Sequence, residues 1–508
     1  MKSRVQLLGE TMQDSLEAFI GACAEVGEAA FVDGASLDEE VGVLTELAAE
    51  ARGPMLVFDR FDGLPEGHRV AANPLRTTRR FGVAFDLPLD AHPLDMLAQW
   101  RVRRRQLSGP LPPAVASDGP VLASRQVGDE VDLDAFPTPK WHERDGGRYI
   151  GTADMVVLRD PDRGWVNVGV YRGMIQGRNR MSLWILAAKH GRMILEKHWA
   201  AGREAPIAVV LGCDPATWMT AAMAAPFGTS EYELAGAFRG SPLEVVNLPA
   251  SGLPVPAHAE IVLEGRIPSP ELDTAYEGPF GEWPGYYSHE GNEPVMTVDT
   301  IYHRERPILL GTPPLRPLGD SDSVAIPSFT LELWDHLDRS GITDVTGVWG
   351  FCKTLMIVVS VKQRYAGHAK QALLAASGFR SGASMYRYYV AVDDDIDVTS
   401  LEQVVWAMCT RADPATSIDV IRGAWTTTLD PRLSPQQLAA GDHTMGRLLV
   451  DACRPFHWRE DFPHSNVFPP QARLRVAQRW DELLRGFGTG QRQVGPGGGH
   501  PGAENASR

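Results

Sequence analysis

The stretch from about residue 126 to about residue 315 is built from short apolar runs separated by turn residues. Many short strands divided by glycine and proline turns are typical of a barrel or a sandwich. Runs with a β-like composition occur at 154–158, 165–171, 181–186, 207–211, 259–263 and 295–302. Two apparent helices, at 191–201 and 215–224, interrupt the pattern. We therefore predict a barrel-like β core for the middle of the chain.

The chain before this core has the pattern of a small α/β domain. It carries helical spacing at 12–24 and 37–51 and a short apolar strand at 54–59. A proline-rich connector begins at Ser108, and such segments often lie at domain boundaries. We predict an N-terminal α/β domain over residues 1–125.

The chain after the core returns to alternating strands and helices, which is typical of βαβ units. The strands are expected at 356–361 and 387–392 and the helices at 367–376 and 401–410. The full prediction is a mixed α/β (α+β) fold. After the N-terminal domain it comprises a split β-barrel over 126–318, a linking helix within 319–345, a C-terminal α/β domain over 346–485 and a glycine-rich disordered tail over 486–508.

The composition excludes several classes of function. The 508 residues carry a formal charge of −15, with 44% apolar and 22% charged residues, so the chain has no strongly basic character for nucleic acid. Its one basic cluster is assigned to a solvated helix or an interface: Arg101, Arg103, Arg104 and Arg105. Five scattered cysteines, no signal peptide and no membrane-length apolar run predict a cytoplasmic enzyme without nucleic-acid or membrane partners.

The segment 276–287 sets two carboxylates, Glu277 and Glu282, among aromatic residues, glycines and prolines. We expect a loop that is neither helix nor regular strand. A pair of carboxylates serves general acid/base chemistry when their surroundings separate their pKa values, and apolar walls raise a carboxyl pKa whereas a guanidinium lowers it. The alternative is a turn with two solvated glutamates.

Upstream, Asn167 and Arg172 lie on one predicted strand with an odd separation, so a regular strand sends them to opposite faces. They can meet one ligand only if the strand ends or bulges between them, and Gly169 is where that is easiest. The alternative is that Arg172 is a surface charge on an edge strand.

The sequence also contains residues that could together bind a metal ion. His190 begins a predicted helix next to Lys189, and such a position favours anions. With Asn167 and either Glu231 or Glu233 it offers imidazole, amide and carboxylate ligands, which suit Mn²⁺ or Mg²⁺ and leave room for phosphate oxygens. The alternative is a helix-capping or surface histidine.

The acidic run Asp393–Asp397 also suggests a metal site, but N-capping and turn formation explain it better. Motifs for nucleotide, serine-hydrolase and zinc-peptidase chemistry are absent from the sequence.

Taken in order, these segments resemble the UbiD-like family of prenylated-FMN-dependent decarboxylases over about residues 130–455. The resemblance rests on the strand at 165–174, Lys189-His190, and the segments at 226–237, 277–282, 394–398, 404–414 and 445–452. It implies an N-terminal α/β unit, a split β-barrel that binds the flavin, a linking helix and a C-terminal oligomerisation domain.

The resemblance also implies roles for individual residues. The metal ligands would be Asn167, His190 and Glu231, with Mn²⁺ or Mg²⁺ anchoring the flavin phosphate. The catalytic set would be Arg172, Glu277 and Glu282. Further cofactor contacts would come from Val168, Gly169, Val170, Tyr171, Arg172, Lys189, Met223, Ala224 and Arg380. The resemblance leaves potassium binding undecided, because Arg411 matches the family whereas the acidic residue expected after it is missing.

The implied reaction is reversible, non-oxidative decarboxylation of an aromatic, heteroaromatic or α,β-unsaturated acid through a covalent substrate–cofactor adduct. Arg172 would grip the substrate carboxylate and keep Glu277 ionised, and Glu282 would deliver the proton. Expected partners are the acid, CO₂, a second copy of the chain or more, and a flavin prenyltransferase that supplies the cofactor. Two alternatives remain, a non-catalytic flavin-binding homologue and a metal-dependent hydrolase.

Overall fold

The structure is a computed structural model that describes residues 14–107, 109–223, 225–288, 290–316, 326–353, 355–379, 385–481 and 483. Its contacts divide the chain into two units, Met1–Phe456 and His457–Arg508. The second unit contains α13 (Pro470–Arg479), which begins at a proline, whose fixed φ suits a first helical turn. The predicted disordered tail at 486–508 lies outside the described residues. No helix in the described ranges has the length and apolar character needed to cross a membrane.

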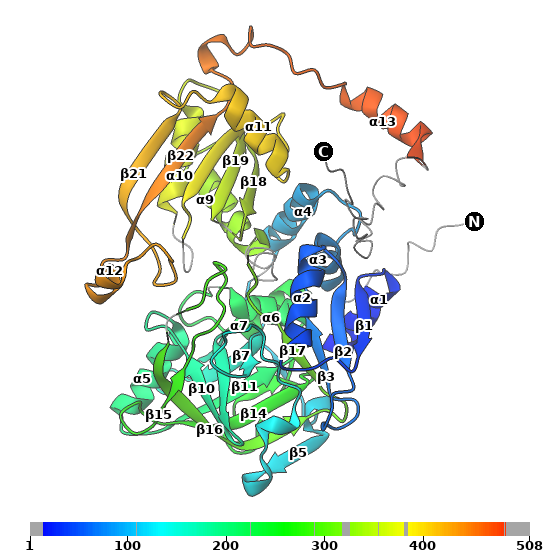
Figure 1. The fold of residues 1–508 in the computed structure, drawn as a ribbon, viewed down its shortest axis with the longest axis vertical. Helices are drawn as coiled ribbons and strands as arrows, with labels where there is room; N and C mark the ends of the chain where they lie inside the picture. The colour runs from blue at the N-terminus through cyan, green and yellow to red at the C-terminus, as the bar shows by residue number, and fades with distance from the viewer. Residues whose placement is uncertain are drawn as a thin grey trace, which may run out of the picture. The chain divides into compact units, whose positions relative to one another are not determined.

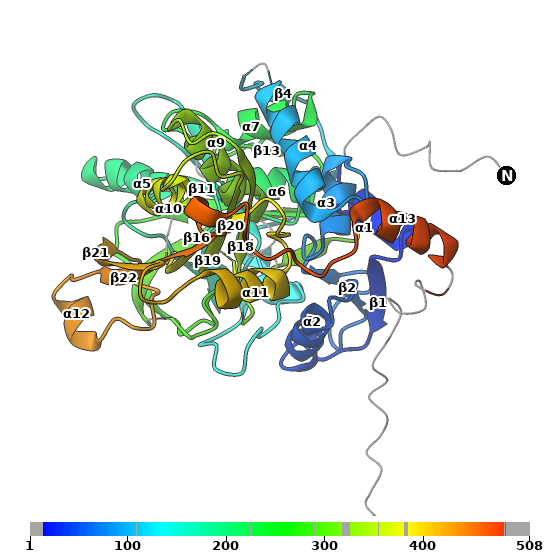
Figure 2. The same ribbon diagram turned by 90° about the horizontal axis from the view of Figure 1, so that it is seen from above.

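The N-terminal unit has the predicted α/β character, and it consists of a four-stranded sheet with helices on both faces. Its strands are, in order, β1 (Ala29–Asp33), β2 (Met55–Asp59), β3 (Arg69–Ala72) and β17 (Ile308–Gly311). Phe58 packs with α2 (Glu40–Glu50) on one face, and Val57 packs with α1 (Leu16–Glu25) on the other (Figure 2). Its edge strand β17 follows the large sheet in sequence, so the chain returns to its N-terminal unit.

The middle of the chain forms a ten-stranded sheet (Figure 1). The main path runs β6-β9-β10-β16-β14-β11-β7-β8, and β5 and β15 also pair with β16. The strands are β5 (Ser124–Val127), β6 (Tyr149–Gly151), β7 (Asp154–Arg159), β8 (Val166–Gly169), β9 (Arg172–Gly177), β10 (Arg180–Trp184), β11 (Ala205–Leu211), β14 (Ile261–Ile267), β15 (Thr274–Glu277) and β16 (Gly291–His303). A small separate sheet joins β4 (Ala114–Val115), β12 (Glu244–Asn247) and β13 (Pro254–Pro256).

The order of the strands shows that the large sheet is curled. β8 and β9 follow each other in sequence with two residues between them, yet they lie near opposite ends of the sheet order. So short a link can join them only if the two ends of the sheet approach each other. The sheet is therefore a half-barrel with a seam between β8 and β9, and the predicted barrel-like core is confirmed.

The basic cluster lies on α4 (Pro93–Arg105) and faces α9 (Leu331–Arg339). Arg101 and Arg105 both pair with Asp335, at 2.8 and 2.6 Å. The cluster thus joins two helices, in agreement with the prediction of an interface. The predicted linking helix is present as α9, although part of that segment lies outside the described residues.

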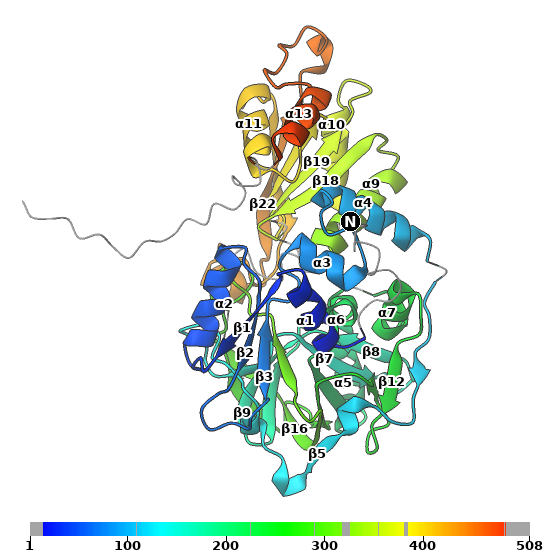
Figure 3. The ribbon, with the colours of Figure 1, turned by 90° about the vertical axis from the view of Figure 1, so that its right-hand side faces the viewer.

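The C-terminal α/β domain is a five-stranded sheet with the βαβ order expected from the sequence. Its strands are β18 (Val345–Phe351), β19 (Met356–Val361), β20 (Tyr388–Asp393), β22 (Thr444–Ala452) and β21 (Ile418–Trp425). Val359 packs on the side of α10 (His368–Gly378), and Val358 on the side of α11 (Leu401–Arg411). The two helices therefore cover opposite faces (Figure 3).

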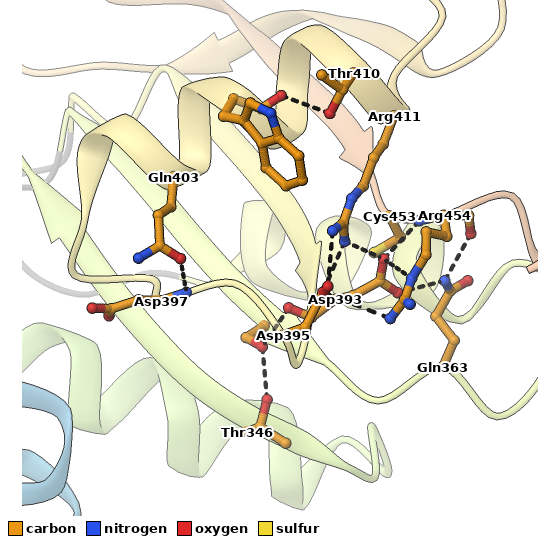
Figure 4. Close-up of polar contacts among 12 residues, drawn as sticks. Thr346, Gln363, Asp393, Asp395, Asp397, Gln403, Thr410, Arg411, Cys453 and Arg454 are labelled. Atoms are coloured by element: carbon orange, nitrogen blue, oxygen red, sulfur yellow. Dashed lines mark hydrogen bonds and ion pairs between the residues drawn. The ribbon is translucent and has the colours of Figure 1, made fainter. Parts of the chain in front are cut away.

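The acidic run at the end of β20 is structural (Figure 4). Arg411 Nη1 forms ion pairs with Asp393 Oδ2 at 2.8 Å and with Asp395 Oδ1 at 2.9 Å. These pairs connect the end of α11 to the end of β20. Asp397 accepts the N–H of Thr399 at 2.9 Å, as a turn residue does. The prediction of N-capping was wrong, because the cap of α11 is Ser400.

Candidate active site

The candidate site lies at the seam of the half-barrel. β8 ends at Gly169 and β9 begins at Arg172, and Val170 and Tyr171 link them. A Cβ on Gly169 would lie 2.5 Å from the Tyr171 hydroxyl, so only glycine fits there. The break predicted at Gly169 is confirmed. It places Asn167 and Arg172 on the two strands that flank the seam.

Arg172 holds two buried carboxylates. Its Nε and Nη2 donate to Oε1 and Oε2 of Glu277 at 2.8 and 2.7 Å, and its Nη1 donates to Oε1 of Glu282 at 2.6 Å. Only 7% of Arg172, 1% of Glu277 and 9% of Glu282 is exposed. Bidentate, charge-assisted hydrogen bonds are among the strongest in proteins. The three residues predicted as a catalytic set are thus in direct contact.

The segment that carries the two glutamates is only partly irregular. Glu277 is the last residue of β15, which pairs with β16, so the prediction that 276–287 contains no regular strand was wrong. The Gly-Pro that follows ends the ladder, because proline has no N–H to donate. Glu282 lies in the following turn, where its N–H donates to the Tyr286 carbonyl at 2.9 Å. Both carboxylates are buried, which excludes the alternative of a solvated turn.

Two further side chains support Arg172 and Glu277, and sequence reasoning missed both. The Tyr149 hydroxyl donates to Oε1 of Glu277 at 2.7 Å. The Arg172 guanidinium lies 4.2 Å from the ring centroid of Trp184, its partner across the β9–β10 pairing. A cation over an aromatic ring is stabilised by the ring electrons. No local motif marks these residues, because only the strand register brings Tyr149 to Glu277 and Trp184 to Arg172.

The two glutamates have different surroundings. Glu277 accepts three hydrogen bonds, from Arg172 and Tyr149, whereas Arg172 gives Glu282 a single one. Burial raises the pKa of Glu282, although the charges of Arg172 and Lys353 oppose the shift. A carboxyl with a raised pKa can carry a proton near neutral pH. The site therefore combines a tightly paired carboxylate with a carboxyl suited to proton transfer.

A second polar group lies on the β8 side of the seam. The Asn167 amide donates to both carboxylate oxygens of Glu231, at 3.0 and 3.2 Å, and the Val168 N–H donates to one of them at 2.7 Å. In the described part of the chain, Asn167 Oδ1 is buried without a hydrogen-bond partner. A buried oxygen without a donor is a suitable ligand for a cation. Asn167 and Glu231 therefore fit the divalent metal predicted for them.

His190, the third predicted ligand, is the first residue of α5 (His190–Ala200). Burial and the charge of Lys189 lower its pKa, which favours the neutral imidazole that binds metals. α5 and α7 (Glu231–Arg239) both contact β8. Glu231, at the start of α7, contacts Asn167, and the His190 ring, at the start of α5, lies 5.4 Å from the ring of Trp165, which precedes β8. Helix N-termini favour phosphate. Since the described residues contain no metal-binding group of three His, Cys, Asp or Glu, an ion here would also need the Asn167 oxygen.

The other predicted cofactor residues are distributed around this group. Val168, Gly169, Val170 and Tyr171 form the end of β8 and the seam, Lys189 precedes α5, and Met223 follows α6 (Pro215–Ala222). Glu233 lies half-buried in the first turn of α7. Ala224 and Arg380 lie outside the described residues.

Two family models cover most of the chain. Residues 114–317 match the 3-octaprenyl-4-hydroxybenzoate carboxy-lyase Rift-related domain, and residues 327–452 match the C-terminal domain of the same carboxy-lyase. A pyrrole-2-carboxylic acid decarboxylase of Pseudomonas aeruginosa is 34% identical over 478 residues, which are 88% of this chain and 93% of that protein. A phenolic acid decarboxylase of Escherichia coli is 30% identical over 490 residues, 92% of this chain and 99% of that protein.

Solved structures agree with these matches. The UbiD-class enzyme HmfF of Pelotomaculum thermopropionicum, in complex with FMN, superposes with a TM-score of 0.80 at 26% identity and covers 91% of this chain and 99% of its own. An evolved dimeric form of HmfF in complex with prFMN gives 0.75 at 25% identity, over 90% and 97%. This chain belongs to the UbiD family and is a carboxy-lyase of that class.

Proposed function

We propose that this protein releases the carboxylate of an aromatic or heteroaromatic acid as CO₂, with prenylated FMN as cofactor. Its catalytic residues would be Arg172, Glu277 and Glu282. The main support is the buried guanidinium of Arg172 shared by two glutamates in different surroundings. The relatives act on pyrrole-2-carboxylic and phenolic acids, and one HmfF structure holds prFMN, which supports the substrate class and the cofactor. α,β-Unsaturated acids also offer an sp² carbon next to the carboxylate and stay within the proposal.

Arg172 binds the substrate carboxylate. A guanidinium has five N–H donors, and three of those of Arg172 are used by Glu277 and Glu282. The remaining donors and the positive charge are available to a carboxylate. Glu277 and Trp184 fix the plane of the guanidinium, so the substrate is held in one orientation.

Glu282 supplies the proton. The bond between the ring carbon and the carboxylate breaks, CO₂ leaves, and a C–H bond forms with the proton of the Glu282 carboxyl. The prenylated flavin, when bound, supplies the electron sink for the pair left on that carbon. In the reverse direction the Glu282 carboxylate accepts the proton, so the same residues serve carboxylation.

The β8 side of the seam would hold the cofactor phosphate. Asn167, His190 and Glu231 would bind Mn²⁺ or Mg²⁺ through one amide oxygen, one imidazole nitrogen and one carboxylate. The helix N-termini at His190 and Glu231 add to the attraction for phosphate. The proposal includes no potassium ion at Arg411, because Arg411 itself forms ion pairs with the carboxylates of Asp393 and Asp395.

The C-terminal domain mediates self-association in this proposal. β21 is an edge strand of its sheet, and α11 exposes Leu401, Val405 and Trp406 by 42, 45 and 45%. Exposed apolar side chains and an unpaired edge favour contact with another chain. Val405→Asp should lower the mass measured by light scattering, and an unchanged oligomer would contradict this interface.

The activity is tested with protein produced alongside a flavin prenyltransferase and Mn²⁺. The holoenzyme is incubated in D₂O with heteroaromatic, phenolic and α,β-unsaturated acids, and CO₂ and deuterium in the product are measured. Release of CO₂ with one deuterium at the former carboxyl position is expected for at least one class. Flavin-free protein with Mn²⁺ should be inactive, which a metal-dependent hydrolase would not be. Absence of turnover and exchange across the panel would contradict the proposal and favour a non-catalytic flavin-binding protein.

A further inference from the structure

The turn that carries Glu282 rests on a buried aspartate. Asp145 accepts the N–H of Gly281 at 2.9 Å through Oδ1, and the N–H of His142 at 2.9 Å through Oδ2. The Asp145 side chain is fully buried. Gly281 directly precedes Glu282 in the chain, so this carboxylate fixes the backbone from which the Glu282 side chain projects.

His142 contacts Asp145 and connects it to a second segment of the chain. Its Nδ1 lies 3.1 Å from Asp145 Oδ2, and its Nε2 lies 2.7 Å from the carbonyl oxygen of Pro314. Both partners are acceptors, and a neutral imidazole has only one N–H to donate. A protonated His142 satisfies both acceptors at once, with both nitrogens donating.

The charges around His142 agree with this assignment. Burial opposes the charged form, but the hydrogen bond and charge of Asp145 raise the pKa of His142, and Glu46 on α2 adds to the effect. The other elements packed against the ring contribute aromatic side chains, Phe280 at 5.7 Å and Tyr287 at 6.3 Å between ring centroids.

The turn is also fitted closely to this support. A Cβ on Gly281 would lie 2.6 Å from Nδ1 of His142, so the backbone lies directly against the imidazole. The Gly146 N–H donates to the Pro279 carbonyl at 2.8 Å, and the Arg144 N–H donates to the Tyr287 hydroxyl at 3.0 Å. The segment from His142 to Gly146 thus binds the turn on both sides of Glu282.

We propose that His142 and Asp145 are positioning residues for the decarboxylation, which hold the Glu282 carboxyl against Arg172 through the backbone of Gly281. The inference rests on the proposed role of Glu282 as the acid. Neither residue contacts the substrate. Their effect on the rate comes from placement, and a displacement of about 1 Å at a reacting group can cost on the order of 100-fold in rate.

The test uses His142→Gln and Asp145→Asn holoenzymes, with His258→Gln as the control. His258 also pairs with a carboxylate, at 3.3 Å from Glu244, which is the first residue of β12 in the small separate sheet. For both variants kcat should fall about 10- to 100-fold, whereas KM and flavin content change less than about twofold. Amide hydrogen exchange should rise in the peptide 278–288. The control should match the parent. Unchanged kcat and exchange in both variants would overturn the proposal.

The pH profile separates positioning from a general loss of folding. In the parent, activity should fall on the alkaline side with two ionisations, those of Glu282 and His142. In His142→Gln only the ionisation of Glu282 should remain. In Asp145→Asn the ionisation of His142 should move to lower pH, because the histidine loses its counter-charge. An unchanged alkaline limb in His142→Gln would contradict the inference. If Glu282→Gln kept full activity while His142→Gln lost it, the acid assignment would fail and the support of the turn would stand.

Discussion

Arg172 and Glu277 form a two-point ion pair inside the protein, with Nε and Nη2 at 2.8 and 2.7 Å from the two carboxylate oxygens. The pair crosses from β9 to the end of β15, so it fixes the seam of the half-barrel to the strand that precedes the Glu282 turn. A buried pair of this geometry leaves neither side chain free to rotate. The remaining face of the guanidinium is thereby presented in one orientation.

Tyr149→Phe should lower kcat about 10- to 100-fold, because the buried Glu277 carboxylate loses a charge-assisted hydrogen bond worth about 1.5–3 kcal/mol. The ring remains, so packing is preserved. Steady-state kinetics on the holoenzyme checks this, with the exposed Tyr388→Phe as the control. A variant as active as the parent would show that the hydroxyl plays no part in orienting Arg172 through Glu277.

Asn167→Ala should weaken Mn²⁺ binding by about 10-fold or more, since the site loses one ligand and Glu231 loses its amide partner. Flavin content should fall with it. Metal analysis and flavin absorbance of the purified variant give the answer, and Asn247→Ala on the exposed end of β12 is the matched control. Parent levels of both metal and flavin in Asn167→Ala would contradict the proposed anchor.

Asp154→Asn should flatten the pH dependence of stability. Burial raises the pKa of Asp154 from its ordinary value of about 3.8 to about 8. Between these pH values the folded protein keeps a proton that the unfolded chain has released, so the free energy of unfolding falls as pH rises, by up to about 1.4 kcal/mol per unit. Asparagine cannot ionise, so the variant should be more stable than the parent at pH 8.

Urea unfolding from pH 5 to pH 8 measures this slope, with Asp129→Asn on an exposed turn as the control. The control should follow the parent at every pH. Equal slopes in Asp154→Asn and the parent would mean that Asp154 is ionised in the folded protein.

The sequence predicted the elements whose signal is local. The helix at His190 and the strand end at Gly169 follow from apolar spacing and from a glycine at the only position where the chain could turn between Asn167 and Arg172. The contact of Arg172 with Glu277 and Glu282 was inferred from the family resemblance, since more than 100 residues separate them in sequence.

Features that depend on strand register could not be predicted. Trp184 reaches Arg172 and Tyr149 reaches its partner Glu277 because β10 and β6 flank β9, and no sequence motif near either aromatic residue marks it. β17 likewise pairs with β3 although more than 200 residues separate the two strands in sequence. The contact between His142 and Asp145 could have been predicted from the sequence. A histidine and an aspartate three residues apart, followed by Gly146 and Gly147, can form a compact turn.

The most direct test of the account is the rate of deuterium incorporation by the Glu282→Gln holoenzyme in D₂O. Glutamine keeps the size of the side chain but carries no transferable proton, so exchange at the former carboxyl position should fall by about 100- to 10,000-fold while flavin absorbance stays at the parent level. Glu305→Gln, at an exposed position, should match the parent. Near-parental exchange by Glu282→Gln would contradict Glu282 as the proton donor.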